Sequence, residues 1–521
     1  MKIEKVKKVL LGLSVVLLAL LLRLWHIGST DIGQDESFSA MCALFPVKDI
    51  IYVLTKGDNP PLWEILLHYW MVWFGVSTVA MRMLPLIFNV LTVVPIYLTG
   101  VRFFMAEADR LSMPDARRAG LYGGLSAALF FAFSNFTLFF AHEVRVYSLV
   151  GLLAAWSLYF FIGWLYRPGR RLYIIGLTVA NLLLMYAHYL AIWVIVMQFM
   201  LWLSVPRCRK ALGSAYLWHL LVLFVLYIPM FPVLWCRFLD SGLHGTWIPK
   251  AESLGDLRKL LWGFLNQNNW LLDFVGLMAV SYVVRMVIKM KSGTYKFGLL
   301  EILACMWMVP LLISFVLSFR VGFLLDRYFY FVLPPLYLSL AWLGLLLGDW
   351  LWRTVPPSGI LVQVVILALM LMNLHADSAY LQYDHRDTRE ASSYLYACSE
   401  RQEAKFIISP FWIIPKMVYN FDARHELFRS QGKLVGRDVE YTEYLVFRCI
   451  YGDYFKPFDF STDSVIAVLH YKYYEPVHLQ KNIQEQNFVW AYTKDFATMQ
   501  VDFYRKESGF DKGVCELPKN Y

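Results

Sequence analysis

The chain has 521 residues, of which 59% are hydrophobic and 17% aromatic, and its mean hydropathy is +0.50. Because soluble globular proteins are only about half apolar, this composition excludes an ordinary soluble enzyme and indicates a polytopic membrane protein. The formal net charge of +9 does not imply a nucleic-acid partner, since the basic residues stand in short loops between apolar runs and no Gly-rich phosphate loop occurs.

The N-terminal segment carries Lys2, Lys5, Lys7 and Lys8 and continues into a first apolar span over about residues 9–26. No small-residue cleavage site follows this span, and further apolar runs do. The pattern predicts an uncleaved signal anchor whose N-terminus lies in the cytoplasm.

The region after the first span is not expected to cross the membrane. Residues 35–45 predict a short amphipathic helix, and a second helix is predicted from the prolines that follow Asn59. Asn59 suits the N-cap, and Pro60 suits the first helical position, where its missing N–H costs nothing. We expect the segment 61–77 to lie flat in the interface because it is short and carries polar groups; a true span is the alternative.

Glu64 and His68 lie four residues apart on this second helix, a spacing that would also suit half of a metal site. We expect structural hydrogen bonds from both side chains instead. The seven cysteines form no CxxC pair and show no zinc-ligand spacing. We therefore expect no required cofactor, with a divalent metal ion kept as the alternative.

Ten further spans are predicted, which makes eleven in all. They cover about residues 82–104, 120–140, 146–166, 172–188, 189–205, 215–235, 270–288, 297–318, 328–348 and 359–376. Counted from a cytoplasmic N-terminus, the loops rich in Lys and Arg fall on the cytoplasmic side, as the positive-inside rule requires. The basic residues on this side, in the loops or at the adjoining span ends, are Arg102, Arg110, Arg117, Arg118, Arg167, Arg170, Arg171, Arg207, Arg209, Lys210, Arg285, Lys289, Lys291 and Arg353.

Cysteine labelling tests this topology. Positions near 115, 169, 208 and 290 should react from the cytoplasm, because they lie in or beside the basic loops. Positions near 34 and 245 and beyond 380 should react from the outside. An exported loop at 110–118 would contradict the eleven-span topology and scatter the proposed site over both faces.

The composition changes after about residue 377 to a mixture of polar and apolar residues. Strands are predicted at 405–409, 464–470, 488–492 and 499–504, and helices at 388–399 and 411–420. The predicted fold class is a polytopic α-helical membrane protein, residues 1–376, followed by a small extracytoplasmic α/β domain, residues 377–521. No catalytic motif occurs in that second domain.

Several polar groups fall on the outer side of the membrane in this topology, although they were not used to build it. They are Asp35-Glu36, His142-Glu-Val-Arg-Val-Tyr147, Ala187-His-Tyr189, the loop 236–269 and Asp326-Arg-Tyr328. Ionisable residues placed at a membrane surface invite a functional explanation. Their convergence predicts one outward-facing site.

The motifs at Asp35-Glu36, Asp58-Asn-Pro-Pro-Leu62, His142 to Tyr147 and Ala187-His-Tyr189 resemble the C-type glycosyltransferase superfamily. The chain looks like bacterial relatives of the dolichyl-phosphate-mannose protein mannosyltransferases and of the lipid A aminoarabinose transferase. Similar segments occur at Met81-Arg-Met-Leu-Pro85 and Arg327-Tyr-Phe-Tyr-Phe-Val-Leu-Pro-Pro335, so the resemblance covers roughly residues 10–345.

The resemblance implies an enzyme of the bacterial inner membrane with an extracytoplasmic active site. It implies transfer of a hexosyl or pentosyl group from a polyprenyl-phosphate carrier to an acceptor hydroxyl, with inversion at the anomeric carbon. The implied partners are this lipid-linked donor, membrane lipids, and a protein, lipid A or polysaccharide acceptor. The family's candidate base is matched by Asp35.

The two adjacent carboxylates are the candidate catalytic residues. Transfer to a hydroxyl requires a base that takes the proton as the new bond forms, and Asp35 is assigned this role. Glu36 is assigned to binding the acceptor or to holding a neighbouring group. The structural alternative for Asp35 is capping of the helix that follows it.

Two arginines are the candidate ligands of the donor phosphate. Arg145 and Arg327 stand at outer span ends, where a guanidinium can form paired hydrogen bonds to a phosphate. The alternative is snorkelling or an ion pair, with Glu143 for Arg145 and with Asp326 for Arg327.

The remaining donor-binding candidates are uncharged or weakly basic. Tyr147, His188 and Tyr189 are assigned to the sugar or phosphate site. Asn59 stands where relatives often carry His or Lys. Its neutral side chain weakens the case for a phosphate contact at that position.

Two other classes of protein remain open. A transporter or flippase of lipid-linked sugars should show repeated halves and charges near the bilayer midplane. The sequence has no internal repeat, and its polar groups gather at one face. An exported binding or scaffold protein would leave Asp35 unexplained.

Overall fold

The computed structural model describes residues 2–56, 59–244, 248–352, 355–374, 386–399, 405–408, 413–421, 440–441, 447–448, 465–472, 477–496 and 499–506. The chain divides into two compact units. The first comprises Met1–Ile27, Ile51–Trp63 and Arg82–Ser378, and the second comprises Gly28–Ile50, Glu64–Met81 and Ala379–Tyr521. Two segments before residue 82 thus belong to the same unit as the C-terminal region, which sequence reasoning treated as separate. The predicted boundary at 376/377 lies outside the described residues.

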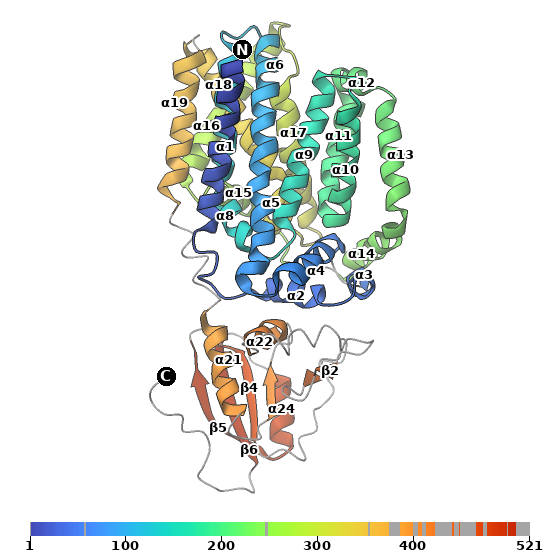
Figure 1. Ribbon diagram of the computed structural model, residues 1–521, viewed down its shortest axis with the longest axis vertical. Coiled ribbons are helices and arrows are strands. Elements are labelled where there is room, and N and C mark those ends of the chain that lie inside the picture. The colour runs from blue at the N-terminus through green and yellow to red at the C-terminus, as the bar shows by residue number, and fades with distance from the viewer. Residues whose placement is uncertain are drawn as a thin grey trace. The chain divides into compact units, whose positions relative to one another are not determined.

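The first unit is helical, and its long helices run side by side (Figure 1). Its helices in chain order are α1 Lys2–Leu24, α5 Thr78–Thr99, the π-helix η1 Gly100–Phe104, α6 Met105–Arg110, α7 Ala116–Ala132, α8 Asn135–His142, α9 Tyr147–Tyr166, α10 Arg171–Ala187, η2 Tyr189–Ala191, α11 Ile192–Ser204, α12 Pro206–Leu212, α13 Ala215–Tyr227, η3 Ile228–Met230, α14 Phe231–His244, α15 Leu254–Phe264, α16 Asn269–Lys291, α17 Leu299–Ser318, η4 Asp326–Val332, α18 Leu333–Trp352 and α19 Val355–Met372.

Each of the eleven predicted spans contains helix at the predicted place. Within the described residues, six helices are long and apolar enough to cross a membrane, or up to eight if each of two bent pairs is one span. The bent pairs are α7 with α8, at 55°, and η2–α11 with α12, at 103°. The structure supports a multi-pass membrane protein, while the count of eleven stays a prediction.

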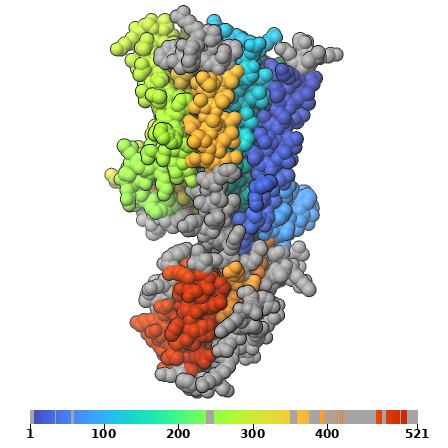
Figure 2. All heavy atoms as spheres, turned by 90° about the vertical axis from the view of Figure 1, so that its left-hand side faces the viewer, coloured from blue at the N-terminus to red at the C-terminus, as the bar shows by residue number. Residues whose placement is uncertain are grey.

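The surface of the first unit fits contact with lipid. The outer face of α1 is exposed along the helix (Figure 2), and it carries Val9, Leu13, Leu17 and Leu21, each more than half exposed. An apolar surface of this length is expected to be covered by acyl chains.

Glycines on α7 allow close packing against α5 and η1. A Cβ atom added to Gly100 would lie 2.3 Å from the Cα of Gly124, and one added to Gly120 would lie 2.7 Å from the carbonyl oxygen of Val101. Gly120 and Gly124 therefore serve close helix packing.

We expect Gly100→Ala to destabilise the first unit by about 1–3 kcal/mol, the usual cost of overpacking a filled interior. The measurement is thermal unfolding of the purified protein in detergent. Gly276→Ala on α16 is the control, because a Cβ there meets no described atom within 4 Å. Equal melting temperatures for Gly100→Ala and wild type would show that the helices can move apart without a loss of stability.

One end of the first unit brings together loops that were predicted to be cytoplasmic. Buried Glu107 accepts a hydrogen bond from the hydroxyl of Tyr166 at 2.5 Å and from the backbone N–H of Leu299 at 3.0 Å. Arg207 lies 3.6 Å from the same carboxylate. The basic loops after α6, α9, α11 and α16 therefore share one end, as the alternating topology requires.

The second unit contains the helices of the first long loop, α2 Gln34–Ala43 and most of α4 Leu62–Phe74. Helix α3 Val47–Lys56 is divided between the units, and residues 78–81 of α5 also belong to the second unit. The helix predicted over 35–45 is confirmed. The predicted start of α4 is wrong by two residues, because Pro60 precedes another proline and is disfavoured from the helical region. With 13 residues, α4 spans about 20 Å, too short for a bilayer core of about 30 Å.

The C-terminal part of the second unit is a small α/β fold. Its elements are α21 Arg386–Ser399, β1 Lys405–Ile408, α22 Ile414–Phe421, β2 Glu440–Tyr441, β3 Phe447–Arg448, β4 Val465–Tyr471, α24 Val477–Glu485, β5 Phe488–Asp495 and β6 Met499–Lys506. The main sheet has the order β1-β4-β6-β5, with β1 parallel to β4 and the other pairs antiparallel. The predicted strands and helices of this region are confirmed where they are described.

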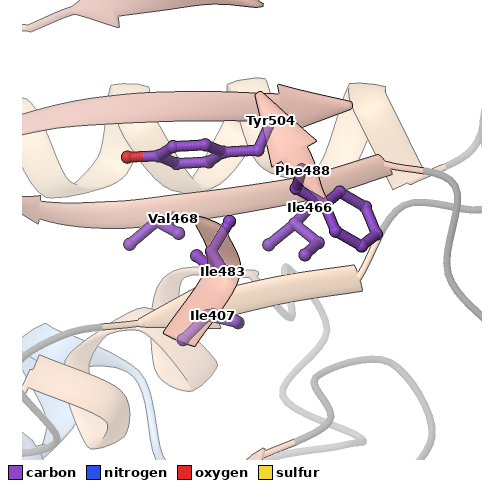
Figure 3. Close-up of a cluster of buried hydrophobic side chains, with 6 residues drawn as sticks. All are labelled: Ile407, Ile466, Val468, Ile483, Phe488 and Tyr504. Carbon is purple, nitrogen blue, oxygen red and sulfur yellow. The ribbon is translucent and has the colours of Figure 1, made fainter. Parts of the chain in front are cut away.

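The alternation of side chains along the strands builds its core. Ile466 and Val468, two residues apart on β4, face the same side and pack with Ile407 of β1 and Ile483 of α24 (Figure 3). Phe488 of β5 and Tyr504 of β6 complete the cluster. Strand β4 is buried on both faces, so its continuous apolar run, and not an alternation with polar residues, places it inside the fold.

Candidate functional site

The predicted site residues lie in both units. Arg145, Tyr147, His188, Tyr189, Arg327 and Asn59 belong to the first unit, and Asp35 and Glu36 belong to the second. The structure brings Arg145, Tyr147, His188 and Arg327 together at one end of the first unit.

Arg145 is held by a tight turn between α8 and α9. The backbone N–H of Arg145 donates to the carbonyl of Glu143 at 2.6 Å, and the side chain is buried. His142, at the end of α8, donates from Nε2 to the carbonyl of Arg23 at 2.6 Å, since a carbonyl can only accept. The turn is therefore anchored to the end of α1, and Tyr147 begins α9 directly after it.

His188 lies in the break between α10 and η2, outside both helices. Its ring centroid is 6.2 Å from that of Tyr147 and 5.3 Å from that of Tyr328. Burial, followed by the positive charges of Arg145 and Arg327, lowers the pKa of His188 to about 4. The imidazole is therefore neutral near pH 7 and does not add a third charge to the two guanidinium groups.

The Nδ1 atom of His188 is buried and has no hydrogen-bond partner among the residues that the structure describes. The whole residue is only 8% exposed. Buried polar atoms are nearly always hydrogen-bonded, so this nitrogen is suited to a bond with a bound ligand. It is the clearest chemical sign of a binding site in the first unit.

Arg327 is positioned by η4, which packs against the N-terminal part of α9. The backbone N–H of Arg327 donates to Oδ1 of Asp326 at 2.7 Å, so the aspartate fixes the start of the turn. The next residue, Tyr328, supplies the ring that faces His188. Sequence reasoning noted Tyr328 as polar but assigned it no role.

A buried polar network packs beneath this cluster, and sequence reasoning missed it. Arg23 is fully buried, and its Nε donates to Oδ1 of Asn89. The amide of Asn89 in turn donates to the hydroxyl of Tyr330 at 2.7 Å and to that of Ser148 at 3.2 Å. The sequence did carry a signal for this network. Arg23 and Asn89 lie inside apolar spans, where polar side chains need hydrogen-bond partners.

Asp35 and Glu36 occupy the first turn of α2 and have different environments. Glu36 is fully buried, and its Oε2 accepts the backbone N–H of Gly33 at 2.5 Å, which caps the helix. Asp35 is half-buried at the second helical position. Glu36 thus caps α2, and the catalytic role of Asp35 stays a prediction.

Glu64 and His68 make the structural hydrogen bonds that were expected of them. Oε1 of Glu64 accepts from the hydroxyl of Ser39 at 2.9 Å, and Nδ1 of His68 donates to the carbonyl of Ala43 at 2.8 Å. Both bonds tie α4 to α2. Across the described residues, no group of three or more His, Cys, Asp or Glu side chains is arranged to hold a metal ion.

Helix α22 of the C-terminal region packs against α2 within the second unit. Asn420 donates from Nδ2 to Oδ2 of buried Asp31 at 2.6 Å. The hydroxyl of Tyr419 donates to the carbonyl of Val76 at 3.0 Å and lies 2.9 Å from that of Thr78. The C-terminal region thus binds the loop that carries Asp35. No sequence motif predicted these contacts of Tyr419 and Asn420.

We expect Asn420→Ala to destabilise the second unit by about 1.5–3 kcal/mol, because it removes a hydrogen bond to a buried carboxylate. Asn420→Asp should cost more, since it faces Asp31 with a like charge. The measurement is limited proteolysis across a temperature series. Gln484→Ala on the exposed face of α24 is the control, and equal protection in all variants would contradict the contact.

Two predicted donor-binding residues are less clearly placed. Asn59 is half-buried in a bend before α4, and Tyr189 is half-buried at the start of η2, next to His188. Of the two, only Tyr189 is next to a residue of the cluster in the sequence, because it follows His188 directly.

Comparison with known proteins gives a likeness in structure alone. No family model matches the sequence, and no curated protein matches it. The fold is similar to that of ArnT from Cupriavidus metallidurans in the apo state, with a TM-score of 0.57 and 12% identity over 96% of this chain and 98% of that one.

Two further structures share the fold. ArnT bound to undecaprenyl phosphate gives a TM-score of 0.55 and 12% identity, over 96% of this chain and 97% of that one. The oligosaccharyltransferase of Archaeoglobus fulgidus in complex with Zn and sulfate gives 0.51 and 12%, over 79% of this chain and 61% of that one. The chain therefore shares the fold of ArnT and of this oligosaccharyltransferase.

Proposed function

We propose that the chain is a membrane glycosyltransferase that moves a sugar from a polyprenyl-phosphate carrier to an acceptor hydroxyl on the extracytoplasmic side of the bacterial inner membrane. The observation that carries this proposal is the cluster of His188, Arg145 and Arg327 at one end of an apolar helical unit. A lipid phosphate fits this position, because its apolar tail suits the apolar helices and its anionic head suits the two arginines.

The cluster suits a leaving phosphate. When the bond between the sugar and the phosphate breaks, the electron pair stays on the phosphate oxygen, and the growing negative charge needs fixed positive partners. Two guanidinium groups can each bind phosphate oxygens in pairs. The neutral imidazole of His188 can add one hydrogen bond, and Tyr147 and Tyr328 bound the space with their rings.

The structural neighbours support the class of donor. One of the ArnT structures that share this fold is bound to undecaprenyl phosphate. A carrier of the same chemistry in this chain would place its phosphate among the arginines and its isoprenoid tail along the apolar helices.

The acceptor side of the reaction is assigned to Asp35. Its carboxylate takes the proton of the acceptor hydroxyl while that oxygen bonds to the anomeric carbon from the face opposite the phosphate. One displacement of this kind inverts the configuration. Glu36 supports the base by fixing the first turn of α2 through its bond to Gly33.

No step in this scheme needs a metal ion or a cofactor. The sugar is a hexosyl or a pentosyl group, and the acceptor is a protein, lipid A or a polysaccharide. Mass analysis of cell-envelope glycans tests the function and identifies both substrates. A deletion strain should lack a specific sugar, and wild-type protein should restore it. An unchanged glycan profile in the deletion strain would count against the enzyme and favour a transporter or scaffold.

A further inference from the structure

The two arginines of the proposed donor site stand on different elements of the first unit. Arg145 lies in the turn before α9, and Arg327 lies near the start of η4. A misplacement of about 1 Å can slow a reaction about a hundredfold, so two side chains that share one phosphate need a fixed separation. The buried side chain of Asn89, on α5, is bonded to both elements.

The amide of Asn89 is oriented by Arg23. The Nε atom of Arg23 donates to Oδ1 of Asn89, and a guanidinium can only donate, so the amide oxygen must face α1. Nη2 of the same guanidinium donates to the carbonyl of Phe131 at 3.3 Å and to the hydroxyl of Thr137 at 3.0 Å, at the break between α7 and α8. The carbonyl of Thr137 in turn accepts from Nδ2 of Asn89 at 3.0 Å. These bonds leave the amide with a single orientation.

The NH₂ group of Asn89 joins α9 to η4. Its Nδ2 atom donates to the hydroxyl of Ser148 at 3.2 Å and to the hydroxyl of Tyr330 at 2.7 Å. Ser148 comes three residues after Arg145, and Tyr330 comes three residues after Arg327. One amide therefore holds the chain close to both arginines.

The ring of Tyr330 also lies directly against α9. A Cβ atom added to Gly151 would lie 2.5 Å from Cε1 of Tyr330, so a larger residue there would displace the ring. Gly151 follows Ser148 by three residues and lies on the same face of α9. Tyr330 is fully buried, and hydrogen bonds in the protein interior are stronger than in water. Shape and hydrogen bonds thus fix the same contact between α9 and η4.

We propose that Asn89 is a positioning residue for the donor phosphate, which acts through Ser148 and Tyr330 to set the separation of Arg145 and Arg327. The inference rests on the proposed function, because it takes the two arginines as ligands of the phosphate. Asn89 itself is buried beneath them and touches no substrate in this scheme.

The first measurement is binding of undecaprenyl phosphate to the full-length protein in detergent, by titration and native mass spectrometry. Tyr330→Phe removes the hydroxyl that bonds to Asn89 and keeps the ring against Gly151. It should weaken binding of undecaprenyl phosphate about threefold to tenfold, the usual effect of losing one neutral hydrogen bond.

Tyr97→Phe is the matched control. Tyr97 lies in the last turn of α5, the helix that carries Asn89, and its hydroxyl donates to the carbonyl of Lys8 at 2.7 Å. This variant also loses one hydrogen bond of the same length between elements of the first unit. It should lower the melting temperature about as much as Tyr330→Phe does, and bind undecaprenyl phosphate as wild type does.

The second measurement asks whether Tyr330 acts through Arg327. When Arg327→Ala has already removed the guanidinium, the added change Tyr330→Phe should weaken binding no further, within about twofold. A hydroxyl that only stabilises the fold would instead cause the same loss with and without Arg327.

The outcomes separate this inference from the proposed function. Equal binding by Tyr330→Phe and wild type, an equal loss in Tyr97→Phe, or a full further loss on top of Arg327→Ala would overturn the positioning role and leave the donor site standing. Failure of the wild-type protein to bind undecaprenyl phosphate would overturn both. If Tyr330→Phe does not fold, Ser148→Ala removes the bond of the same amide to α9, and unchanged binding in that variant would also reject the positioning role.

Discussion

Replacing Asp35 by asparagine should abolish most sugar transfer while expression, folding and donor binding stay intact. The change preserves the size of the side chain and removes its ability to take a proton. A loss of about a hundredfold to ten-thousandfold is expected, the usual contribution of a positioned general base. Glu36 caps α2, so Asp35→Asn leaves that capping bond in place.

The controls for Asp35→Asn lie in the same loop. Asp49→Asn changes a half-buried carboxylate in the first turn of α3 and should leave transfer unchanged. Asp35→Glu should recover little activity, since one added methylene displaces the carboxylate from the acceptor hydroxyl. Glu36→Gln should mainly lower stability. Full activity of a folded Asp35→Asn protein would move the base elsewhere.

The second large effect is expected at the donor phosphate. Arg145→Ala and Arg327→Ala should each reduce transfer about tenfold to a hundredfold, because a hydrogen bond to a charged group contributes roughly 1.5–3 kcal/mol. The loss should appear as weaker use of the lipid-linked donor, with acceptor dependence unchanged. The measurement is initial rate against donor concentration with purified protein in nanodiscs.

Arg320→Ala is the matched control for the arginine variants. Arg320 is exposed and lies between α17 and η4, only a few residues before Arg327. It should behave as wild type. Arg145→Lys is informative as well, since a lysine keeps the charge but not the paired hydrogen bonds of a guanidinium. Normal donor kinetics in both alanine variants would reduce the two arginines to anchors at the membrane surface.

Much of the fold could be predicted from the sequence because runs of apolar residues mark its buried elements. Long runs located the helices of the first unit, and short runs rich in β-branched and aromatic residues located β1, β4, β5 and β6. The start of α4 was missed because the mutual constraint of Pro60 and Pro61 outweighs the tolerance of proline in a first turn. Helix breaks such as the one between α7 and α8 left no clear mark in an apolar sequence.

The candidate site was only partly predictable. His188 and Arg327 could be grouped because both fall at outer span ends. The bond between Asn420 and Asp31, however, joins residues far apart in sequence, and neither belongs to a motif. The capping role of Glu36 also needed the backbone, since it depends on that carboxylate reaching the N–H of Gly33.

The most direct measurement is transfer itself. Purified full-length protein in nanodiscs should be incubated with a panel of polyprenyl-phosphate sugars and acceptors extracted from the deletion strain, with both product and released polyprenyl phosphate quantified. The account predicts equal amounts of the two, inverted anomeric configuration by NMR, and loss of both in Asp35→Asn. Retained configuration, or equal turnover by wild type and Asp35→Asn, would contradict it.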